Sequence, residues 1–453
     1  MRVSEIIKVT KGKLLSGSPK TEIDPSRIST DSRTIKRGDF FVALKGPKFD
    51  GNEFVREVLK KGAIGAIITH NAQRTTHNDK VIIRVSDTTK SLQDIAAYHR
   101  SKFQTPVICV TGSNGKTTVK DMIWHILSAK YNVLRNEGTK NNHIGVPQTL
   151  LQLKKSHDIC VLELGTNHEG EIGSLARIAR PNAAVITNIS PAHLEFLGDL
   201  EGIFREKSSI LNYLDKKGGL LVLNGDDKFL SRIKKKGFNV IRYGFGEACD
   251  LKAEALPARG KGLLFVLNNR MIFSLAALGI HNVYNAMAAI AVGLSFGLEH
   301  RLIRKALSGY KPAGMRLALE NIRGIDIVND SYNSNPLSMM KALEVVKDYP
   351  ARAKWIVSGD MLELGNESER FHRMIGEFIA KAGIEGLMTF GEFSRHTLSQ
   401  ARALGMTPSR LWHCSTHDEI AQTIKKVARP GDVVLVKGSR GMQMEKVLEK
   451  LKT

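Results

Sequence analysis

The segment of the sequence best suited to chemistry is 110–118, which reads VTGSNGKTT. It follows an apolar run and precedes a stretch in which apolar residues recur at helical spacing. In such a turn, glycines let backbone N–H groups approach phosphate oxygens, a lysine supplies positive charge, and the next hydroxyl can coordinate Mg²⁺. The segment predicts a phosphate-binding loop, with candidate nucleotide contacts at Gly112, Ser113, Asn114, Gly115, Lys116, Thr117 and Thr118.

The loop departs from the common phosphate-binding pattern at one position. That pattern has a glycine five residues before its Gly-Lys pair, where this sequence has Val110. The shortened form argues against a general nucleoside triphosphatase, and a glycine-rich turn that only begins a helix is the alternative. The order of strand, loop and helix favours the phosphate-binding interpretation, because a helix N-terminus attracts anions.

Two series of elements must position these and other polar side chains. From about residue 105, apolar runs alternate with helical periods, which is typical of a parallel sheet with crossover helices. The expected strands are 107–111, 159–164, 183–188 and 219–224, and a second series has strands at 325–330, 354–360, 386–391 and 432–438. Polar residues cluster where the strands end, which is where open α/β sheets bind ligands.

The length and pattern together indicate an α/β protein of three domains. The chain has 453 residues, 42% of them hydrophobic, and a domain takes about 150 residues on average. Residues 1–85 differ from the rest, with short strands expected at 40–44, 63–69 and 80–85 between polar turns. We expect domains at 1–86, 87–312 and 313–453, with a hinge in the turn-rich stretch 309–316.

Several classes of protein are disfavoured by composition. The N-terminus lacks the continuous apolar stretch of a signal peptide, and no run approaches the roughly 20 apolar residues of a membrane span. The four cysteines have no paired spacing, which favours reduced thiols and a cytoplasmic location; they are Cys109, Cys160, Cys249 and Cys414.

The net charge of +22 raises the alternative of a nucleic-acid-associated P-loop ATPase. The basic residues are spread along the chain, however, and the one dense run is the lysines at 234–236. No basic motif is interleaved with aromatic residues. A basic surface that suits small anionic substrates is the preferred interpretation, with no nucleic-acid partner.

Further segments accompany the loop in a fixed order and together with it resemble the Mur ligase family. They are NEGTKNNHIGVP (136–147), LELGTNHEGEI (162–172), NISPAHLEFLG (188–198), FREKSSIL (204–211), GIHNVYNAMAA (279–289), GMRL (314–317) and NDSYNSNP (329–336). The resemblance covers essentially the whole chain. It implies a small N-terminal UDP-substrate domain, a central P-loop ATPase domain with a parallel sheet, and a C-terminal Rossmann-like domain.

The resemblance implies an ATP-dependent ligase that forms a peptide bond through an acyl phosphate. Because a carboxylate must attack an anionic γ-phosphate, the site needs cations and Mg²⁺. The implied metal ligands, for two Mg²⁺ sites, are Thr117, Glu163, His193 and a carbamylated Lys207. Without the resemblance, Glu163 could be a helix cap or an ion-pair partner, His193 a structural residue, and Lys207 a solvated helical lysine.

Other roles follow from the resemblance alone. It places His281, Asn282 and Asn285 beside the adenine, has Arg316 stabilise phosphoryl charge, and has Asp330 order the hinge and the ribose. The implied catalytic set is therefore Lys116, Glu163, His193, Lys207, Arg316 and Asp330.

Two segments favour one member of the family, the ligase that adds D-alanyl-D-alanine to UDP-N-acetylmuramoyl-tripeptide. Residues 29–51 resemble the UDP-substrate domain shared by the ligases that add the third residue and the terminal dipeptide, with candidate contacts at Ser32, Arg33 and Lys45. This segment argues against a folylpolyglutamate-type ligase, which lacks such a domain. The segment NDSYNSNP resembles the DSYNANP-type motif of the dipeptide-adding ligase, and the candidate dipeptide contacts are Asn333, Asn335 and Asp360. A ligase for the third residue and a folylpolyglutamate-type ligase are the alternatives. We expect a monomer.

Overall fold

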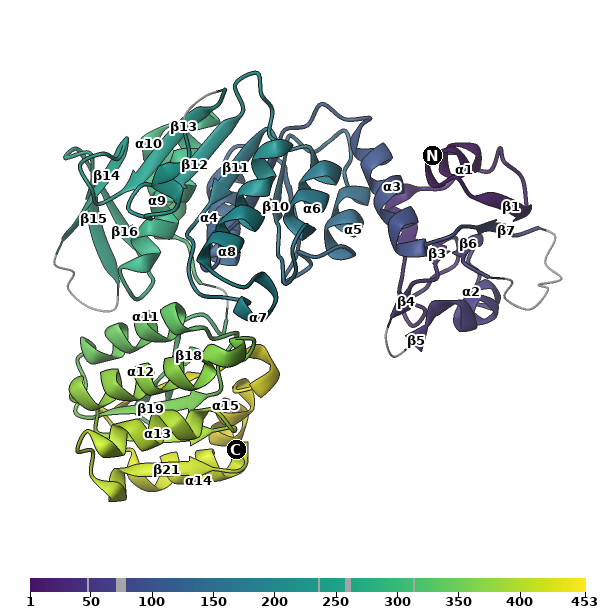
Figure 1. Ribbon diagram of the computed structural model, residues 1–453. Coiled ribbons are helices and arrows are strands. Elements are labelled where there is room, and N and C mark those ends of the chain that lie inside the picture. The colour runs from purple at the N-terminus through teal and green to yellow at the C-terminus, as the bar shows by residue number, and fades with distance from the viewer. Residues whose placement is uncertain (47–48, 71–78, 235–236, 257–261, 313) are drawn as a thin grey trace.

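The computed structural model describes residues 1–46, 49–70, 79–234, 237–256, 262–312 and 314–453. These residues form three main sheets that follow one another along the chain (Figure 1). Several fully buried strands run parallel in the two larger sheets, as the apolar runs of the sequence predicted. The α/β fold class is thereby confirmed. Two residues of the lysine run at 234–236 lie outside the described residues. One residue of the expected hinge at 309–316 also lies outside them.

The first sheet has the strand order β1-β7-β6-β3-β2, with β1 antiparallel to β7 and the other pairs parallel. The predicted strands correspond to β3 (Phe40–Val42), β6 (Gly65–Ile68) and β7 (Val81–Arg84). The remaining elements are α1 (Val3–Thr10), β1 (Lys13–Ser16), β2 (Ile28–Ser29), β4 (Lys45–Gly46), β5 (Phe49–Asp50) and α2 (Val55–Lys60), with single 3₁₀ turns at Pro25–Arg27 and Gly51–Phe54.

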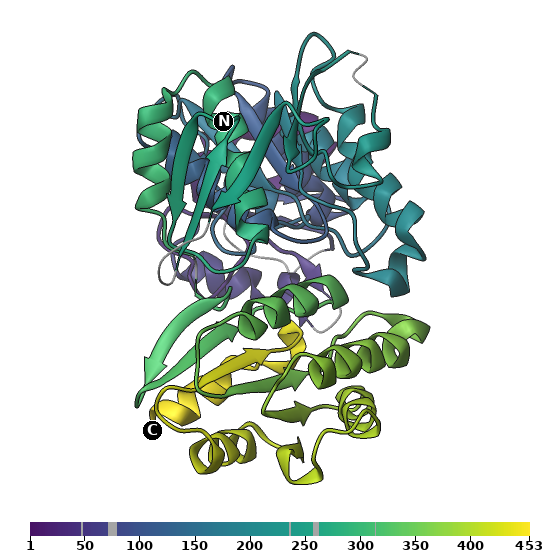
Figure 2. The same cartoon turned by 90° about the vertical axis from the view of Figure 1, so that its left-hand side faces the viewer.

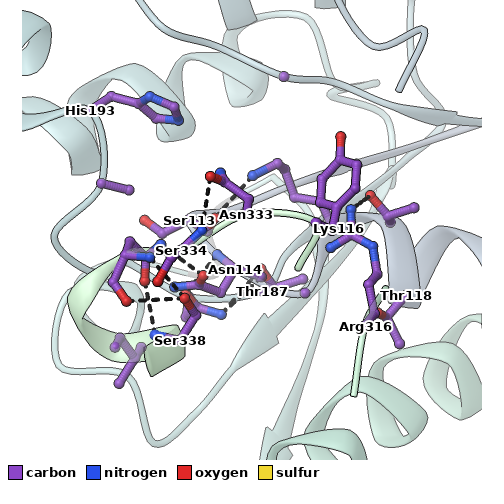
Figure 3. Close-up of a pocket in the computed structure, with 18 of the residues that line it drawn as sticks. Ser113, Asn114, Lys116, Thr118, Thr187, His193, Arg316, Asn333, Ser334 and Ser338 are labelled. Atoms are coloured by element: carbon purple, nitrogen blue, oxygen red, sulfur yellow. Dashed lines mark hydrogen bonds between the residues drawn. The ribbon is translucent and has the colours of Figure 1, made fainter. Parts of the chain in front are cut away.

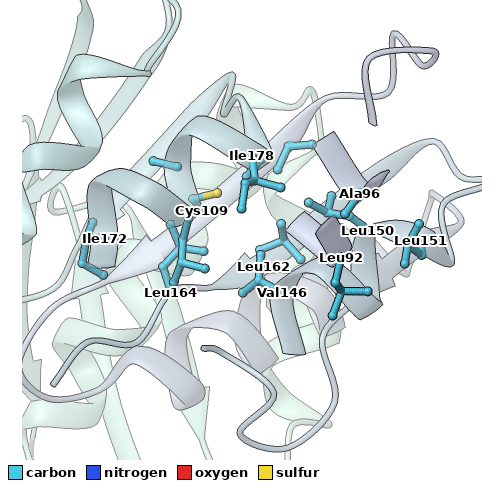
Figure 4. Packing of buried hydrophobic residues seen from close by; sticks show 14 of the residues in the cluster. Leu92, Ala96, Cys109, Val146, Leu150, Leu151, Leu162, Leu164, Ile172 and Ile178 are labelled. Atoms are coloured by element: carbon cyan, nitrogen blue, oxygen red, sulfur yellow. The ribbon is translucent and has the colours of Figure 1, made fainter. Parts of the chain in front are cut away.

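Helix α3 (Thr88–Arg100) joins the first sheet to the middle domain (Figure 1). Its buried residues Leu92 and Ala96 belong to a hydrophobic cluster that continues from the first sheet into helices α5 (Gly145–Leu151) and α6 (Glu171–Ala179) (Figure 4). Because this apolar surface is shared, α3 holds the two parts together by hydrophobic burial. The boundary expected after residue 86, just before α3, stays a prediction.

The middle sheet has the strand order β16-β15-β14-β13-β12-β11-β8-β10-β9. From β14 to β9 the strands run parallel, and β14, β15 and β16 pair as antiparallel neighbours. The strands are β8 (Val107–Thr111), β9 (Val133–Arg135), β10 (Ile159–Glu163), β11 (Ala183–Ile186), β12 (Leu220–Asn224), β13 (Asn239–Gly244), β14 (Leu251–Leu256), β15 (Leu263–Leu267) and β16 (Met271–Leu275).

The chain order reverses at β8, because β9 and β10 lie on one side of it and β11 lies on the other. Such a reversal opens a crevice at the carboxyl ends of the strands, where α/β sheets bind their ligands. The helices of this domain include α4 (Lys116–Leu127), α7 (Leu194–Leu197), α8 (Leu200–Ser208), α9 (His281–Ser295) and α10 (His300–Ser308), with 3₁₀ turns at Ser209–Asn212 and Leu230–Arg232.

The third sheet has the strand order β17-β18-β22-β19-β20-β21 and lies below the middle domain in both views (Figures 1 and 2). Only β17 is antiparallel to its neighbour, and hydrophobic clusters cover both faces. Its strands are β17 (Ala318–Ile322), β18 (Ile325–Asp330), β19 (Lys354–Gly359), β20 (Gly386–Phe390), β21 (Leu411–Cys414) and β22 (Val433–Lys437). Its helices are α11 (Pro336–Lys347), α12 (Ser368–Lys381), α13 (Ser394–Ala403), α14 (His417–Val427) and α15 (Glu445–Lys452), with 3₁₀ turns at Gly365–Glu367, Pro408–Arg410 and Arg440–Met442.

Among the described residues, no helix is both long enough and apolar enough to cross a bilayer.

Candidate active site

The predicted phosphate loop connects β8 to α4 at the reversal of the middle sheet. Gly112 and Gly115 have φ of 142° and 80°, a region that favours glycine. A Cβ atom added at Gly112 would lie 1.9 Å from the hydroxyl oxygen of Thr187. Lys116 begins α4, and its Nζ donates hydrogen bonds of 2.8 Å and 3.0 Å to the carbonyl oxygens of Gly112 and Ser113. The lysine charge is thus held over the loop, at the N-terminus of a helix.

The segment after β11 supports this loop from the other side. Asn188 accepts from the backbone N–H groups of Ser113 and Asn114, through its carbonyl and side-chain oxygens at 2.9 Å and 3.1 Å. The hydroxyl of Thr187 donates to the carbonyl oxygen of Asn114 at 2.5 Å. Sequence reasoning assigned no role to either supporting residue, although both belong to or adjoin the segment NISPAHLEFLG. The signal that could have identified these two residues was that motif, NISPAHLEFLG.

Glu163 ends β10, the strand beside β8, and its side chain is 2% exposed. Asn141 donates to its Oε1 at 2.7 Å, whereas its Oε2 has no hydrogen-bond partner among the described residues. Asn136 fixes the backbone of Glu163, accepting from its N–H at 2.9 Å and donating to its carbonyl oxygen at 3.0 Å. A buried carboxylate oxygen without a partner is costly, so this one fits a cation that binds there.

The donor set around Glu163 suits Mg²⁺ in the company of phosphates. No three His, Cys, Asp or Glu side chains gather as a metal site in the described part of the chain. Mg²⁺ is commonly held by one or two carboxylates together with substrate phosphate oxygens, and therefore needs no such cluster. Thr117 and Glu163 both line the same cavity and fit this pattern.

His193 lines the cavity from the turn before α7, with φ of 55°. Its Nδ1 lies 2.5 Å from Oε2 of Glu363, a residue of the C-terminal domain. The imidazole holds the pKa of the Glu363 carboxyl below its usual range, so the carboxylate stays ionised. Glu363 also has a positive φ, of 62°, and this left-handed conformation costs a non-glycine residue about 1–2 kcal/mol.

Lys207 lies in α8 and is 2% exposed. It is not among the described residues that line the cavity. Burial, reinforced by the nearby positive charge of Lys116, lowers its pKa well below the ordinary value. The adjacent Glu206 does not neutralise it by contact, because its carboxylate accepts hydrogen bonds from the backbone N–H groups of Gly170 and Ile172.

A cavity of about 880 Å³ lies between the phosphate loop and the C-terminal domain (Figure 3). Figure 3 shows Lys116 and Arg316 near one another, with His193 at the opposite side. The predicted residues that line it are Ser113, Asn114, Gly115, Lys116, Thr117, Thr118, Glu163, His193, His281, Asn282, Asn285, Arg316, Asp330, Asn333 and Asn335. Fifteen residues spread from 113 to 335 are therefore brought to one space.

Two hydrogen bonds tie the C-terminal domain to the phosphate loop. Arg316 donates from Nη2 to the hydroxyl of Thr117 at 3.0 Å, and its guanidinium lies 3.9 Å from the ring centroid of Tyr332. Asn335, the N-cap of α11, donates from Nδ2 to the side-chain oxygen of Asn114 at 2.8 Å. Both contacts set C-terminal residues against the loop that is predicted to bind phosphate.

Asp330 ends β18 and organises the segment that carries Arg316. Its Oδ1 accepts from the backbone N–H of Leu317 at 3.1 Å, and its Oδ2 pairs with Nζ of Lys437 at 2.5 Å. Lys437 is 1% exposed and also donates to the carbonyl oxygen of Asn333 at 2.8 Å. The sequence reasoning missed Lys437, although it lies at the end of the strand expected at 432–438.

The three residues expected beside the adenine lie at the start of α9. Asn285 donates to the side-chain oxygen of Asn282 at 2.9 Å, and Asn282 donates to the carbonyl oxygen of Leu278 at 2.7 Å. Burial and the charges of Lys341 and Lys437 lower the pKa of His281 to about 4, so its imidazole is neutral. Neutral amide and imidazole groups of this kind can hydrogen-bond the edge of a base.

One predicted dipeptide contact, Asp360, has other partners in the C-terminal domain. Asp360 is not among the described residues that line the cavity. Its carboxylate instead accepts from the backbone N–H groups of Phe393 and Ser394 at 3.2 Å and 2.7 Å, at the start of α13. The side chain thereby satisfies open N–H groups at a helix N-terminus. Its contact with the dipeptide stays a prediction.

The predicted UDP contacts lie in the first domain, away from the residues that line the cavity. Arg33 pairs with Asp31 at 2.7 Å, and Lys45 lies 3.9 Å from Asp50. The carbonyl oxygen of Ser32 accepts from Nζ of Lys61 at 3.0 Å. Their role in substrate binding stays a prediction.

Comparison with known proteins identifies the family. Residues 110–293 match the Mur ligase middle domain, residues 315–440 match the Mur ligase glutamate ligase domain, and residues 26–100 match the Mur ligase family catalytic domain. The chain is 36% identical over 452 residues to the UDP-N-acetylmuramoyl-tripeptide–D-alanyl-D-alanine ligase of Bacillus subtilis, covering 99% of this chain and 98% of the relative. The chain belongs to the Mur ligase family.

Solved structures agree with this membership. The Mur ligase described here superposes on MurF of Acinetobacter baumannii with a TM-score of 0.89 and 33% identity, over 100% of this chain and 98% of the other. It superposes on MurF of Thermotoga maritima, solved in complex with ADP, with a TM-score of 0.84 and 27% identity, over 95% and 98% of the two chains. The resemblance seen in the sequence motifs is confirmed, and the protein is a ligase.

Proposed function

We propose that this Mur ligase joins D-alanyl-D-alanine to UDP-N-acetylmuramoyl-tripeptide with consumption of ATP. The observation that carries the proposal is the contact of Asn335 with Asn114, which sets the segment NDSYNSNP directly against the phosphate loop. Full-length similarity to ligases named for this reaction supports the same substrates. The C-terminal domain would then present the dipeptide to a tripeptide carboxylate activated at the loop.

The reaction has two chemical steps. The terminal carboxylate of the tripeptide attacks the γ-phosphorus of ATP, and ADP leaves to give an acyl phosphate. The amine of the dipeptide then attacks the acyl carbon, inorganic phosphate leaves, and the nitrogen loses a proton. Lys116 and Arg316 lie together at the loop, where their charges stabilise the phosphoryl oxygens during the first step. Docking of the C-terminal domain keeps water from the acyl phosphate.

The residues present fit Mg²⁺. Thr117 and Glu163 would hold one ion beside the phosphates, and His193 would contribute to a second site. Bound Mg²⁺ supplies positive charge that offsets the repulsion between the two reacting anions.

Lys207 is proposed to be carbamylated. Carbamylation requires a neutral amine, and burial with the nearby Lys116 charge lowers the pKa of Lys207 in the direction that produces one. The new carboxylate would then serve the second Mg²⁺ site, whereas an ammonium group would repel the ion. We also propose that the protein is cytoplasmic, as its free and mostly buried cysteines favour, and that it is a monomer.

The proposal is tested by the substrate requirement for phosphate release from ATP. Release should need both UDP-N-acetylmuramoyl-tripeptide and D-alanyl-D-alanine, and mass spectrometry should detect the pentapeptide product. A third-residue ligase would instead require the corresponding dipeptide precursor and a single amino acid. A folylpolyglutamate-type ligase would require a folate and glutamate. A nucleic-acid-associated ATPase would be stimulated by polynucleotide, and any of these results would reject the proposal.

A further inference from the structure

The closest side-chain contact between the middle and C-terminal domains at the cavity joins His193 to Glu363. Nδ1 of the imidazole lies 2.5 Å from Oε2 of the carboxylate, and the backbone N–H of Glu195 donates to the carbonyl oxygen of Glu363 at 3.5 Å. Both members of the pair have positive φ, of 55° and 62°. A strained conformation persists only where its surroundings enforce it, and such residues cluster at functional sites.

The segment that carries Glu363 is firmly anchored in its own domain. The backbone N–H of Met361 donates to Nε2 of the buried His372 at 3.1 Å, and that of Leu362 donates to the hydroxyl of Ser439 at 2.9 Å. The N–H of Ser439 in turn donates to the carbonyl oxygen of Asp360 at 2.9 Å. Glu363 therefore moves with the C-terminal domain as a rigid extension of it.

The contact with Glu363 also determines which nitrogen of the His193 imidazole carries the hydrogen. The carboxylate of Glu363 can only accept, so Nδ1 of His193 carries the hydrogen, and in the neutral ring Nε2 keeps its lone pair. A carboxylate on the far nitrogen is the arrangement that orients metal-binding histidines and makes them better ligands. Here that carboxylate comes from a different domain, whereas Glu163 and Thr117 belong to the middle domain.

We infer that Glu363 is a positioning residue that fixes the tautomer and orientation of His193, so that the metal site is completed only when the C-terminal domain is docked. The inference rests on the proposed role of His193 in metal binding. Because such coupling is reciprocal, a bound metal should favour the docked domain as much as docking favours the metal. Loss of the carboxylate should weaken metal affinity without touching the nucleotide directly.

The test measures Mn²⁺ binding by electron paramagnetic resonance, with the full chain and a non-hydrolysable ATP analogue. Glu363→Ala should raise the Kd for Mn²⁺ about 10- to 100-fold, the usual effect of removing such a partner. Alanine bears the same backbone strain as glutamate at this φ, so the fold should be retained. Glu363→Leu, which keeps a similar side-chain volume but has no oxygen to accept from Nδ1–H, replaces the alanine variant if circular dichroism shows that the latter is unfolded.

The matched control is Glu367→Gln on the same segment. Glu367 pairs with Arg370 on the surface, and its removal should leave the Kd for Mn²⁺ unchanged. His193→Ala and the double variant with Glu363→Ala complete a thermodynamic cycle, in which Glu363→Ala should have no effect once the imidazole is gone.

The outcomes separate this inference from the proposed function. If His193→Ala weakens Mn²⁺ binding but Glu363→Ala and Glu363→Leu do not, the positioning role is wrong while the metal role of His193 stands. An equal loss from Glu363→Ala with and without the imidazole would also overturn it, because Glu363 would not act through His193. If His193→Ala itself leaves the Kd unchanged, both the metal role of His193 and the inference fail.

Discussion

Arg316 of the C-terminal domain donates a hydrogen bond of 3.0 Å to the hydroxyl of Thr117, a residue 199 positions earlier in the chain. Thr117 is the residue of the phosphate loop that is proposed to coordinate Mg²⁺. The guanidinium therefore reaches the phosphate loop, and Asp330 and Lys437 organise the backbone that positions it. Docking of the C-terminal domain thus brings an additional positive charge to the loop.

Arg316→Ala should lower the rate of acyl phosphate formation by about 100- to 1,000-fold, as expected for the loss of a cation that stabilises transition-state charge. Single-turnover release of ADP in the presence of both substrates measures this step. The control is Arg304→Ala on the exposed face of α10, which should be as active as the parent protein. Near-normal turnover of Arg316→Ala would show that the contact with Thr117 is only structural.

Glu163→Gln should remove the effect of Mg²⁺ on thermal stability. The free carboxylate oxygen is the group that the ion is proposed to bind, and the substitution replaces it with an amide nitrogen that cannot coordinate a cation. With an ATP analogue present, the parent Tm should rise on addition of Mg²⁺ because the ion binds the folded state, whereas that of the variant should not. Glu169→Gln, at an exposed position on the following loop, should respond as the parent does. An unchanged response of Glu163→Gln would exclude Glu163 as the ligand.

Lys207→Ala should be nearly inactive, and acetate or formate should partly restore activity by replacing the proposed carbamate. Rescue should saturate with carboxylate concentration and should not occur with chloride at equal ionic strength. The matched control is the exposed Lys216→Ala, which should need no rescue. A Lys207→Ala protein of near-normal activity, or an unmodified amine beside bound Mg²⁺ in a crystal structure, would contradict carbamylation.

His281 should make the free energy of unfolding depend on pH. The unfolded chain binds a proton at this histidine near pH 6.5, whereas the folded chain does so only near its lowered pKa of about 4. Between these values the unfolded state holds more protons, so stability should fall as the pH is lowered from about 6.5 to about 4. Urea unfolding of His281→Gln should show a smaller fall over this window. His300→Gln, at an exposed site, should match the parent, and identical slopes for all three proteins would refute the assignment.

Much of the local structure could be predicted from the sequence. The apolar runs at 107–111 and 183–188 became buried parallel strands, and Val119, Met122, Ile123, Ile126 and Leu127 became the buried face of α4. These features depend on the periodicity of apolar residues, which is set by residues close together in the sequence. The phosphate loop was equally evident, because its glycines, lysine and threonine act within a few residues of one another.

The tertiary structure alone decided which polar side chains line the cavity. Asp360 follows a strand end, as an active-site carboxylate often does, yet the fold places the N-terminus of α13 beside it and its oxygens cap that helix. Lys437 and Glu363 are the opposite case, because neither was predicted as a site residue and both contact one. Their partners Asp330 and His193 lie 107 and 170 residues away in the sequence. Residue type and spacing determine a strand, a helix or a loop. Which charged groups meet across a cavity depends on how whole sheets pack, since that packing sets the distances between atoms remote in sequence.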